Sequence, residues 1–323
     1  MIDVMFYEAF EEEREEIRAV LPKSIRAAYT SKTIQEAKAK NPPCAVISVR
    51  TQSRVPAAWI EKIDGILTRS QGYDHLSAVR QKAGSRVACG YLGSYCSRAV
   101  AEHAVLMTMA LLRALKKQTR QFLSFKRDGL TGRELRGKRA LVVGVGNIGR
   151  EIVDVAKGLG MPVRGVDIAP KLKGIPYVSL KEGLAWADVI FCALPLTKKT
   201  AGMFNYSALQ GIRPGTIFIN IARGEISPIA DLKRLLDKGA LGGVGIDVYP
   251  EEGALADFLR SGAKRPPVRI KKTLEFARRE NVICTPHNAF NTREALKEKA
   301  ALTADSLAMF LREGRFPHPV PAG

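Results

Sequence analysis

Three glycines stand at a spacing that suits the binding of a dinucleotide. Gly144, Gly146 and Gly149 form a G-x-G-x-x-G motif, with Asn147 and Ile148 inside it, between the apolar run ALVV and an amphipathic segment. The first glycine permits a tight turn, the second lets a pyrophosphate approach the backbone at a helix N-terminus, and the third lets helix and strand pack closely. The motif predicts a strand, a phosphate-binding loop and a helix; a purely structural turn that needs glycine is the alternative.

An acidic residue follows this motif at the distance that such a site requires. Asp167 closes the next apolar run, 18 residues after Gly149. Its carboxylate would accept hydrogen bonds from the adenosine ribose hydroxyls and would repel a 2′-phosphate. The sequence therefore predicts NAD as the cofactor, in preference to NADP.

One of the four histidines follows a proline at the end of an apolar run. His287 lies in CTPHNAF (284–290). Histidine is the side chain best suited to exchange a proton near neutral pH, and a carboxylate beside it, for which Glu252 is the candidate, would favour the imidazolium. The alternatives are a histidine with satisfied hydrogen bonds at a domain edge and a solvated loop glutamate.

Arg223 follows the apolar run TIFINIA, at the end of a strand where open α/β sheets bind ligands. Its planar guanidinium suits a carboxylate, and the backbone amides of Gln71 and Gly72 would complete the clamp. A substrate whose carboxylate is held in this way could receive a proton on an oxygen and a hydride on a carbon, and a nicotinamide performs the last step. The alternative for Arg223 is a surface cation.

Composition limits the class of protein. With 46% hydrophobic and 26% charged residues, the 323-residue chain is typical of a globular protein and is long enough for two domains. No apolar window reaches the roughly 18 residues of a membrane span. Its acidic start, MIDVMFYEAFEEERE, does not resemble a signal peptide. We therefore expect a cytoplasmic protein without membrane attachment.

Cysteine spacing and charge also limit the partners. The five cysteines are scattered without CxxC spacing, which predicts reduced core residues, no disulfide framework and no metal site. The formal charge of +19 is spread along the chain and is not interleaved with aromatic residues. This distribution favours a solvated surface over a specific nucleic-acid partner.

Strand-like and helix-like segments alternate along most of the chain, which predicts parallel sheets covered by helices on both faces. Apolar, β-branched runs are expected as strands at 3–7, 24–30, 44–50, 65–70 and 86–92, and again at 140–146, 162–168, 188–195, 216–222, 242–248 and 281–286. Helix-like segments lie among the first five strands at 11–21, 33–40, 57–63 and 76–84.

Three longer segments complete the pattern. A helical pattern runs from about 98 to 124, and its apolar part, 98–115, exposes more hydrophobic surface than a monomer usually tolerates. A basic insertion, 253–280, with Pro266 and Pro267 at its middle, is expected to be a surface elaboration. A final helix, about 291–313, is ended by Gly314.

Six motifs in this order resemble those of the D-2-hydroxyacid dehydrogenase family, and the similarity runs from about residue 44 to residue 310. They are RSQGYDHL (69–76), AVAEHA (99–104), ALPLTKKTAGMFN (193–205), INIARGEI (219–226), GIDVYPEE (245–252) and TPHNAF (285–290). The insertion before His287 and the wording HNAFNT are more similar to the D-lactate dehydrogenase branch. By contrast, VRTQSRV (49–55) resembles the substrate loop of the phosphoglycerate branch.

The resemblance implies roles for individual residues. Arg223, Glu252 and His287 would form the catalytic trio. His103, on the apolar helix, is expected to be a packing or capping residue. On the cofactor side the family would use Leu194, Pro195, Thr200, Ala222 and Asp247. Asp247 would also support Arg223. On the substrate side it would use Arg50, Gln71, Gly72, Tyr95 and Arg223.

We therefore predict an α/β protein with two doubly wound parallel-sheet domains. A Rossmann-type NAD domain, 99–289, would be inserted into a flavodoxin-like substrate domain made of 1–98 and 290–323. The predicted function is NAD-dependent interconversion of a 2-oxo acid and a D-2-hydroxy acid. The alternative is an NAD-sensing binding protein similar to co-repressors of the same fold. The apolar helix and the resemblance together imply a homodimer.

Overall fold

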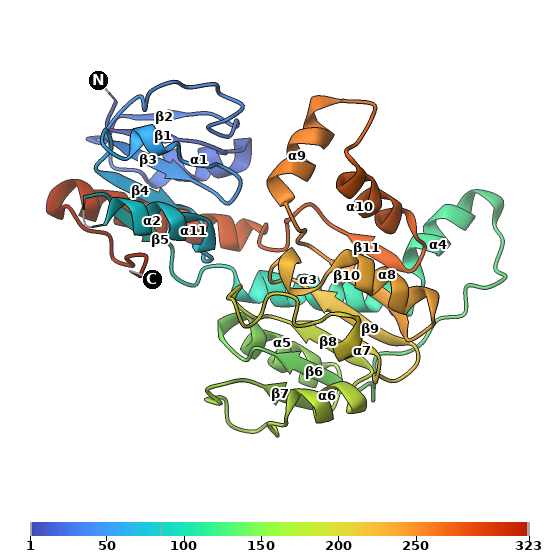
Figure 1. Ribbon diagram of the computed structural model, residues 1–323. Coiled ribbons are helices and arrows are strands. Elements are labelled where there is room, and N and C mark those ends of the chain that lie inside the picture. Colours follow the sequence, from blue (N-terminus) through green and yellow to red (C-terminus); the bar gives the residue numbers. More distant parts are fainter. Residues whose placement is uncertain (1, 85, 322–323) are drawn as a thin grey trace. The chain divides into compact units, whose positions relative to one another are not determined.

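The computed structural model describes residues 2–84 and 86–321. The chain divides into two compact units, which we call unit 1 (Met1–Cys96 with Asn291–Gly323) and unit 2 (Ser97–Phe290). Each unit contains one parallel sheet with helices packed against it (Figure 1). The predicted class of two parallel-sheet α/β domains is confirmed.

Unit 1 contains a five-stranded parallel sheet, sheet A, in the order β2-β1-β3-β4-β5. This is the flavodoxin-like strand order. β3 and β4 are buried along their whole length because apolar side chains occupy both of their faces. The strands are β1 (Val4–Phe6), β2 (Ala27–Tyr29), β3 (Val46–Val49), β4 (Gly65–Thr68) and β5 (Ala88–Tyr91).

The helices of unit 1 depart from the sequence-based expectation at two segments. At 57–63 only a 3₁₀ helix over Ala57–Trp59 forms, followed by turns. The helix expected at 33–40 is wrong: these residues form turns, in which Thr33 N donates to Glu36 Oε2 (2.8 Å) and Glu36 N donates to Thr33 Oγ1 (3.1 Å). Two prolines begin two residues beyond the segment and disfavour its continuation as a helix. The helices are α1 (Glu11–Val20), α2 (Ser77–Ala83), α11 (Arg293–Glu313) and the 3₁₀ helices η1 (Ala57–Trp59) and η2 (Asp74–Leu76).

Three charged side chains are buried together inside unit 1. Glu13 accepts hydrogen bonds from Arg69 Nε (3.1 Å) and Nη2 (3.3 Å) and forms an ion pair with Lys299. None of the three is more than 1% exposed. Burial lowers the pKa of Lys299 to about 7. Burial alone would raise the pKa of Glu13, but Arg69 and Lys299 hold it well below its usual range. The three residues join α1, the end of β4 and α11.

Unit 2 contains a six-stranded parallel sheet, sheet B, in the order β11-β10-β9-β8-β6-β7. An isolated parallel bridge between Gly165 and Tyr177 adjoins β7, where the Rossmann order has one more strand. The outer strand of that order is therefore reduced to one residue pair. The strands are β6 (Ala140–Val143), β7 (Val163–Val166), β8 (Val189–Cys192), β9 (Thr216–Asn220), β10 (Leu241–Ile246) and β11 (Val282–Cys284).

The helical segment expected at 98–124 is interrupted. Ala114 adopts a left-handed conformation (φ 49°), and the returning chain at Arg133 donates its N–H to Leu112 O (2.8 Å). The expected insertion forms α9 and α10, with Pro266 and Pro267 between them. The helices are α3 (Ser97–Leu112), α4 (Leu115–Gln121), η3 (Phe122–Ser124), α5 (Asn147–Gly158), α6 (Leu180–Trp186), α7 (Tyr206–Leu209), η4 (Gly224–Ile226), α8 (Ile229–Asp237), α9 (Glu252–Ser261) and α10 (Val268–Arg278).

The cysteines are free thiols in both units. Cys89, Cys96 and Cys192 are buried, and Cys44 and Cys284 are half-buried. Burial raises the pKa of Cys89, Cys96 and Cys284 to about 11 and that of Cys192 to about 12. The pKa of Cys44 is raised by burial as well.

In the part of the chain that the structure describes, every helix is too short or too polar to span a membrane.

Candidate functional site

The glycine motif forms a loop between β6 and α5, and sterics explain two of its glycines. Gly144 has a φ of +92°, and a Cβ there would lie 2.6 Å from Ala193 O. A Cβ at Gly149 would lie 1.9 Å from Gly144 O, so only glycine permits this approach of α5 to the loop. At Gly146 a Cβ would meet nothing within 4 Å, which leaves open space beside the N-terminus of α5. This cradle fits a pyrophosphate.

Asp167 follows β7 and connects that strand to the glycine loop. Its Oδ2 accepts a hydrogen bond from Val145 N (2.7 Å) and its Oδ1 accepts one from Ala169 N (2.8 Å). A carboxylate has roughly four lone-pair sites, so the two that remain suit the hydroxyls of a ribose. Asp167 is half-buried and therefore combines a fixed position with access from solvent.

The other residues predicted on the cofactor side lie at the same carboxyl edge of sheet B. Thr200 Oγ1 donates to Pro195 O (2.6 Å) and accepts from Thr197 N (2.8 Å), so its side chain holds the loop after β8 in shape. Leu194 is half-buried in that loop. Asn147 and Ile148 begin α5, and Ala222 is buried after β9.

Arg223 follows β9, and the buried Asn220 fixes its backbone. The Asn220 amide donates from Nδ2 to Arg223 O (2.9 Å) and accepts at Oδ1 from Ala222 N (2.9 Å). The Arg223 side chain is half-buried and donates from Nη1 to Ala222 O (2.8 Å). The guanidinium is thus placed at the carboxyl end of a central strand by a short-range network.

Gly224 brings the Arg223 loop against the loop that precedes Glu252. A Cβ at Gly224 would lie 2.0 Å from Tyr249 C and 2.2 Å from Pro250 N. Only a residue without a side chain allows the two backbones to pack this closely. Gly224 is therefore required for packing, and Arg223 before it carries the charge.

His287 and Glu252 form a hydrogen-bonded pair. His287 Nδ1 lies 2.7 Å from Glu252 Oε1, and the two side chains are 23% and 19% exposed. His287 has a φ of 53°, and its N–H donates to Thr285 O (2.9 Å). This left-handed conformation is uncommon for residues other than glycine and persists where neighbouring contacts determine it. The turn at Thr285–Ala289, which we call the His287 turn, is therefore held by its surroundings.

Asp247 supplies contacts that hold the His287 turn. Its carboxylate is buried, with 1% of the residue exposed, and accepts from Thr285 Oγ1 (2.5 Å), Asn288 N (2.8 Å) and Ala289 N (2.9 Å). These bonds tie Asp247 to the turn, and its expected support of Arg223 and the cofactor stays a prediction. Thr285 was not predicted; its position directly before Pro-His was the only signal in the sequence.

We expected His103 to be a packing or capping residue, and it lies within α3, away from both ends of that helix. Its Nε2 is 3.1 Å from Thr285 Oγ1. Thr285 O also accepts a hydrogen bond from Tyr249 OH (2.8 Å). Sequence analysis could not find this contact because it joins residues 182 positions apart.

Apart from Arg223, the residues predicted on the substrate side belong to unit 1 and lie at the carboxyl edge of sheet A. Arg50 follows β3, and its guanidinium carbon lies 5.3 Å from the centre of the Phe10 ring. Gln71 and Gly72 lie in the loop after β4, where Gly72 O accepts from Ser70 Oγ (2.7 Å). The fourth residue, Tyr95, follows β5 and is half-buried.

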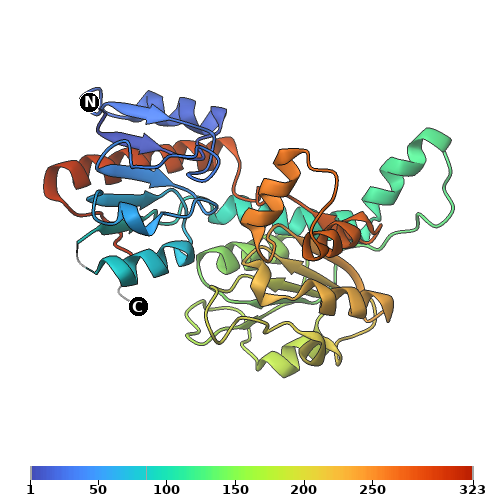
Figure 2. The same ribbon diagram turned by 45° about the horizontal axis from the view of Figure 1, so that its top comes forward.

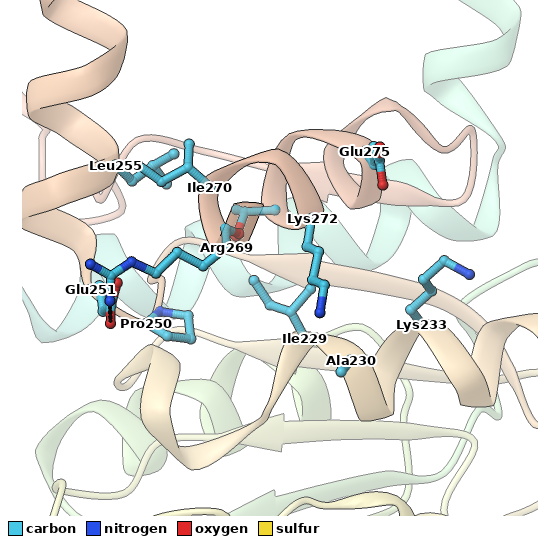
Figure 3. A pocket seen from close by; sticks show the side chains of 11 residues that line it. Ile229, Ala230, Lys233, Pro250, Glu251, Leu255, Arg269, Ile270, Lys272 and Glu275 are labelled. Atoms are coloured by element: carbon cyan, nitrogen blue, oxygen red, sulfur yellow. Dashed lines mark hydrogen bonds and ion pairs between the residues drawn. The ribbon is translucent and has the colours of Figure 1, made fainter. Parts of the chain in front are cut away.

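A cavity of about 450 Å³ lies between α8, α10 and the start of α9 (Figure 3). Arg269 extends toward Glu251 and forms an ion pair with it, and Lys272 points toward the first turn of α8. Neither the glycine loop nor the trio of Arg223, Glu252 and His287 lines this cavity. It is therefore distinct from the site built on the strand ends.

Within the described residues, no cluster of three or more histidine, cysteine and acidic side chains is placed to hold a metal ion. The carboxyl edge of sheet B instead combines a pyrophosphate cradle, an acid for a ribose, an arginine and a histidine–carboxylate pair. This combination on a parallel α/β fold defines a dinucleotide-dependent oxidoreductase.

Comparison with known proteins places this class in one family. Residues 104–289 match the family "D-isomer specific 2-hydroxyacid dehydrogenase, NAD binding domain". The chain is 31% identical over 295 residues to 2-hydroxyacid dehydrogenase A of Aspergillus oryzae (88% of this chain, 82% of that protein). It is 29% identical over 263 residues to D-lactate dehydrogenase of Lactiplantibacillus plantarum (79% and 77%). The structure of a D-lactate dehydrogenase from Aquifex aeolicus, complexed with NAD and lactic acid, aligns with a TM-score of 0.84 at 27% identity, over 99% of each chain.

The chain belongs to the D-isomer specific 2-hydroxyacid dehydrogenase family, on the D-lactate dehydrogenase-like branch. It is an NAD-dependent enzyme that interconverts 2-oxo acids and 2-hydroxy acids. The predictions of family, cofactor and activity are confirmed. These comparisons do not support the alternative of a co-repressor-like binding protein.

Proposed function

We propose that this enzyme reduces a short 2-oxo acid of the pyruvate class to the D-2-hydroxy acid and catalyses the reverse oxidation. The observation that carries the proposal is the 2.7 Å contact between His287 Nδ1 and Glu252 Oε1, at the strand edge that also presents Arg223. The names of the relatives and structural neighbours, D-lactate dehydrogenases among them, support the choice of substrate class.

Arg223 holds the substrate carboxylate in this proposal. A guanidinium offers two parallel N–H donors that match the two oxygens of a carboxylate. Asn220 fixes the backbone on both sides of the Ala222–Arg223 peptide, so the guanidinium starts from a rigid base. The carboxylate position then determines where the neighbouring carbonyl group lies.

His287 donates the proton to the substrate oxygen during reduction. Glu252 occupies Nδ1, so Nε2 is the nitrogen that exchanges the proton. A carboxylate at 2.7 Å stabilises the imidazolium, which is the form that reduction requires. In the oxidation direction the neutral imidazole accepts the proton from the hydroxyl group.

NAD supplies the hydride acceptor or, as NADH, the hydride donor at the substrate carbon. The glycine loop would hold the pyrophosphate, and Asp167 would accept hydrogen bonds from the adenosine ribose. The loop after β8, with Leu194, Pro195 and Thr200, would cover the cofactor. Ala222 and Asp247 would support the nicotinamide end, Asp247 through the His287 turn.

Unit 1 is the substrate domain in this proposal, and unit 2 is the NAD domain. The segment boundaries found in the chain, 1–96 with 291–323 and 97–290, support this division. Arg50, Gln71, Gly72 and Tyr95 would contact the substrate from the carboxyl edge of sheet A.

A homodimer is the proposed assembly. Five apolar side chains on α3, α4 and η3 are between 44% and 93% exposed: Leu106, Met109, Leu115, Phe122 and Leu123. Figure 2 shows α4 and the chain after it extending away from sheet B within unit 2. Exposed apolar surface of this extent indicates a protein interface. Light scattering should give twice the 35.3 kDa of one chain, and a monomer at micromolar concentration would contradict the assignment.

The proposed location is the cytoplasm. The five free thiols suit a reducing compartment, where disulfides are rare. Cell fractionation with an antibody against the native protein tests this assignment, and recovery with the exported proteins would contradict it.

Turnover of NADH with a panel of 2-oxo acids, followed by chiral analysis of the product, tests the proposed function. Pyruvate and its short homologues should be reduced to the D-isomer. His287→Gln should lower the rate by about 10² to 10⁴, the usual contribution of general acid–base catalysis. It should leave NADH binding intact. The proposal fails if no 2-oxo acid is reduced, or if His287→Gln keeps its turnover.

A further inference from the structure

We propose that His103 is a positioning residue that holds the His287 turn in its catalytic geometry by donating a hydrogen bond to Thr285. This inference rests on the proposed role of His287 as the acid and base. His103 lies near the middle of α3, far from the turn in sequence, and its Nε2 lies 3.1 Å from Thr285 Oγ1.

Thr285 is the residue through which this contact acts. Its hydroxyl bonds to Asp247, and its carbonyl oxygen accepts from Tyr249 OH (2.8 Å) and from His287 N (2.9 Å). Asp247 in turn accepts from Asn288 N (2.8 Å) and from the amide that follows it. The backbone is therefore fixed immediately before and immediately after His287.

The direction of the hydrogen bonds determines which nitrogen of His103 carries a hydrogen. A threonine hydroxyl has a single hydrogen. At 2.5 Å from Asp247 Oδ1, the Thr285 hydroxyl donates that hydrogen to the carboxylate, since this distance is typical of O–H donating to an ionised oxygen. Thr285 Oγ1 can then only accept from His103, so Nε2 of His103 carries a hydrogen. The order of donation is His103 to Thr285 to Asp247.

The turn needs this support because its backbone conformation is unfavourable. His287 has a φ of 53°, a left-handed conformation that is unfavourable for a residue with a side chain. Loss of the His103 contact would leave the Thr285 hydroxyl with one partner fewer and would let the strand end shift relative to α3. A shift of about 1 Å in a catalytic group can lower a rate by up to about 10²-fold.

Two substitutions at position 103 separate positioning from packing. His103→Leu removes the donor and fills its place on α3 with an apolar side chain of similar size. His103→Gln keeps an N–H₂ group at nearly the same reach and does not titrate. We expect the leucine variant to lose between about tenfold and 10²-fold in kcat. NADH affinity should stay unchanged, and the glutamine variant should recover most of the lost rate.

A double-mutant cycle with Thr285→Val tests whether the effect passes through the hydroxyl. The rate loss of His103→Leu combined with Thr285→Val should be smaller than the product of the two single losses, because both remove the same contact. Thr108→Val is the matched control, since Thr108 is a buried hydroxyl on the same helix that donates to Ala104 O (2.9 Å). It should keep normal kcat.

The thermal unfolding midpoint of each variant is measured first, to establish that the variant is folded at the assay temperature. Normal kcat in folded His103→Leu overturns the inference, as does a leucine variant that glutamine does not rescue or a fully multiplicative double mutant. Failure of the proposed function gives a different result: His287→Gln would then keep its turnover. If His287→Gln is inactive and His103→Leu is normal, only the role of His103 fails.

Discussion

Glu252 Oε1 lies 2.7 Å from His287 Nδ1, although the two residues follow different strands of sheet B. Glu252 is the first residue of α9, after β10, and His287 follows β11. Because β10 and β11 are neighbours in a parallel sheet, their carboxyl ends meet at one edge. The pair therefore depends on the register of two strands and on the left-handed turn that aims the imidazole.

Glu252→Gln should lower kcat for reduction. Reduction needs the imidazolium, and the amide stabilises that cation less than the carboxylate that lies 2.7 Å from Nδ1. NADH affinity should change comparatively little. Steady-state reduction rates and NADH titration measure this. Glu251→Gln is the matched control, because Glu251 is an exposed neighbour that pairs with Arg269. Equal kcat for wild type and Glu252→Gln would exclude Glu252 as the partner.

Asp167→Ser should relax the preference of the enzyme for NADH over NADPH. The carboxylate repels a 2′-phosphate, and a serine removes that charge. Because Asp167 also accepts from Val145 N (2.7 Å), some loss of affinity for both coenzymes should accompany the change. The ratio of kcat/KM for the two coenzymes is the measurement. Equal use of both coenzymes by the wild type would refute the assignment of Asp167.

Gly146→Ala and Gly149→Ala should fail in different ways. A Cβ at Gly149 would lie 1.9 Å from Gly144 O, so the alanine must displace the loop and lower the free energy of unfolding. A Cβ at Gly146 meets nothing within 4 Å, so this variant should keep its stability and lose NADH affinity if a pyrophosphate approaches there. Urea unfolding and NADH fluorescence titration distinguish the two. Normal NADH affinity in Gly146→Ala would contradict the placement of the pyrophosphate.

Lys299→Met should change how stability depends on pH. Burial lowers the pKa of Lys299 to about 7 in the folded protein, well below the value of about 10.4 for a lysine in an unfolded chain. Between these values the unfolded state binds more protons, so the free energy of unfolding should rise with pH, by at most about 1.4 kcal/mol per unit. The methionine variant should lack this rise, while Arg69 still pairs with Glu13. Urea unfolding between about pH 7 and pH 9 tests this, and identical slopes would refute it.

Every expected strand is present. The central strands β3, β4, β6, β8 and β9 were the most predictable, since burial on two faces leaves a continuous apolar run in the sequence. The segment 33–40 was wrongly predicted as a helix because the hydrogen bonds between Thr33 and Glu36 resemble those at the start of a helix. Ile34 N instead donates to Ser53 Oγ (3.2 Å), far along the chain. The break of the long helix at Ala114 depends likewise on a distant residue, Arg133.

Residues at the strand ends were predictable for a related reason. Arg223, Glu252 and His287 each follow an apolar run, and the ends of parallel strands gather at one edge. The contacts that hold these residues in place were not predictable. The contact of His103 with Thr285, for example, depends on how α3 packs against the end of β11. The close approach at Gly224 is also invisible in the sequence, where an Arg-Gly pair looks like a surface turn.

The buried thiols give the enzyme a chemical tolerance that its catalysis does not require. Peroxides and alkylating agents attack thiolates, and burial raises the pKa of every cysteine in the chain above the ordinary value. The thiolate fraction at neutral pH is correspondingly small. The enzyme should therefore keep exchanging reducing equivalents between NADH and 2-oxo acids during an oxidative burst, when proteins with exposed, ionised cysteines are inactivated.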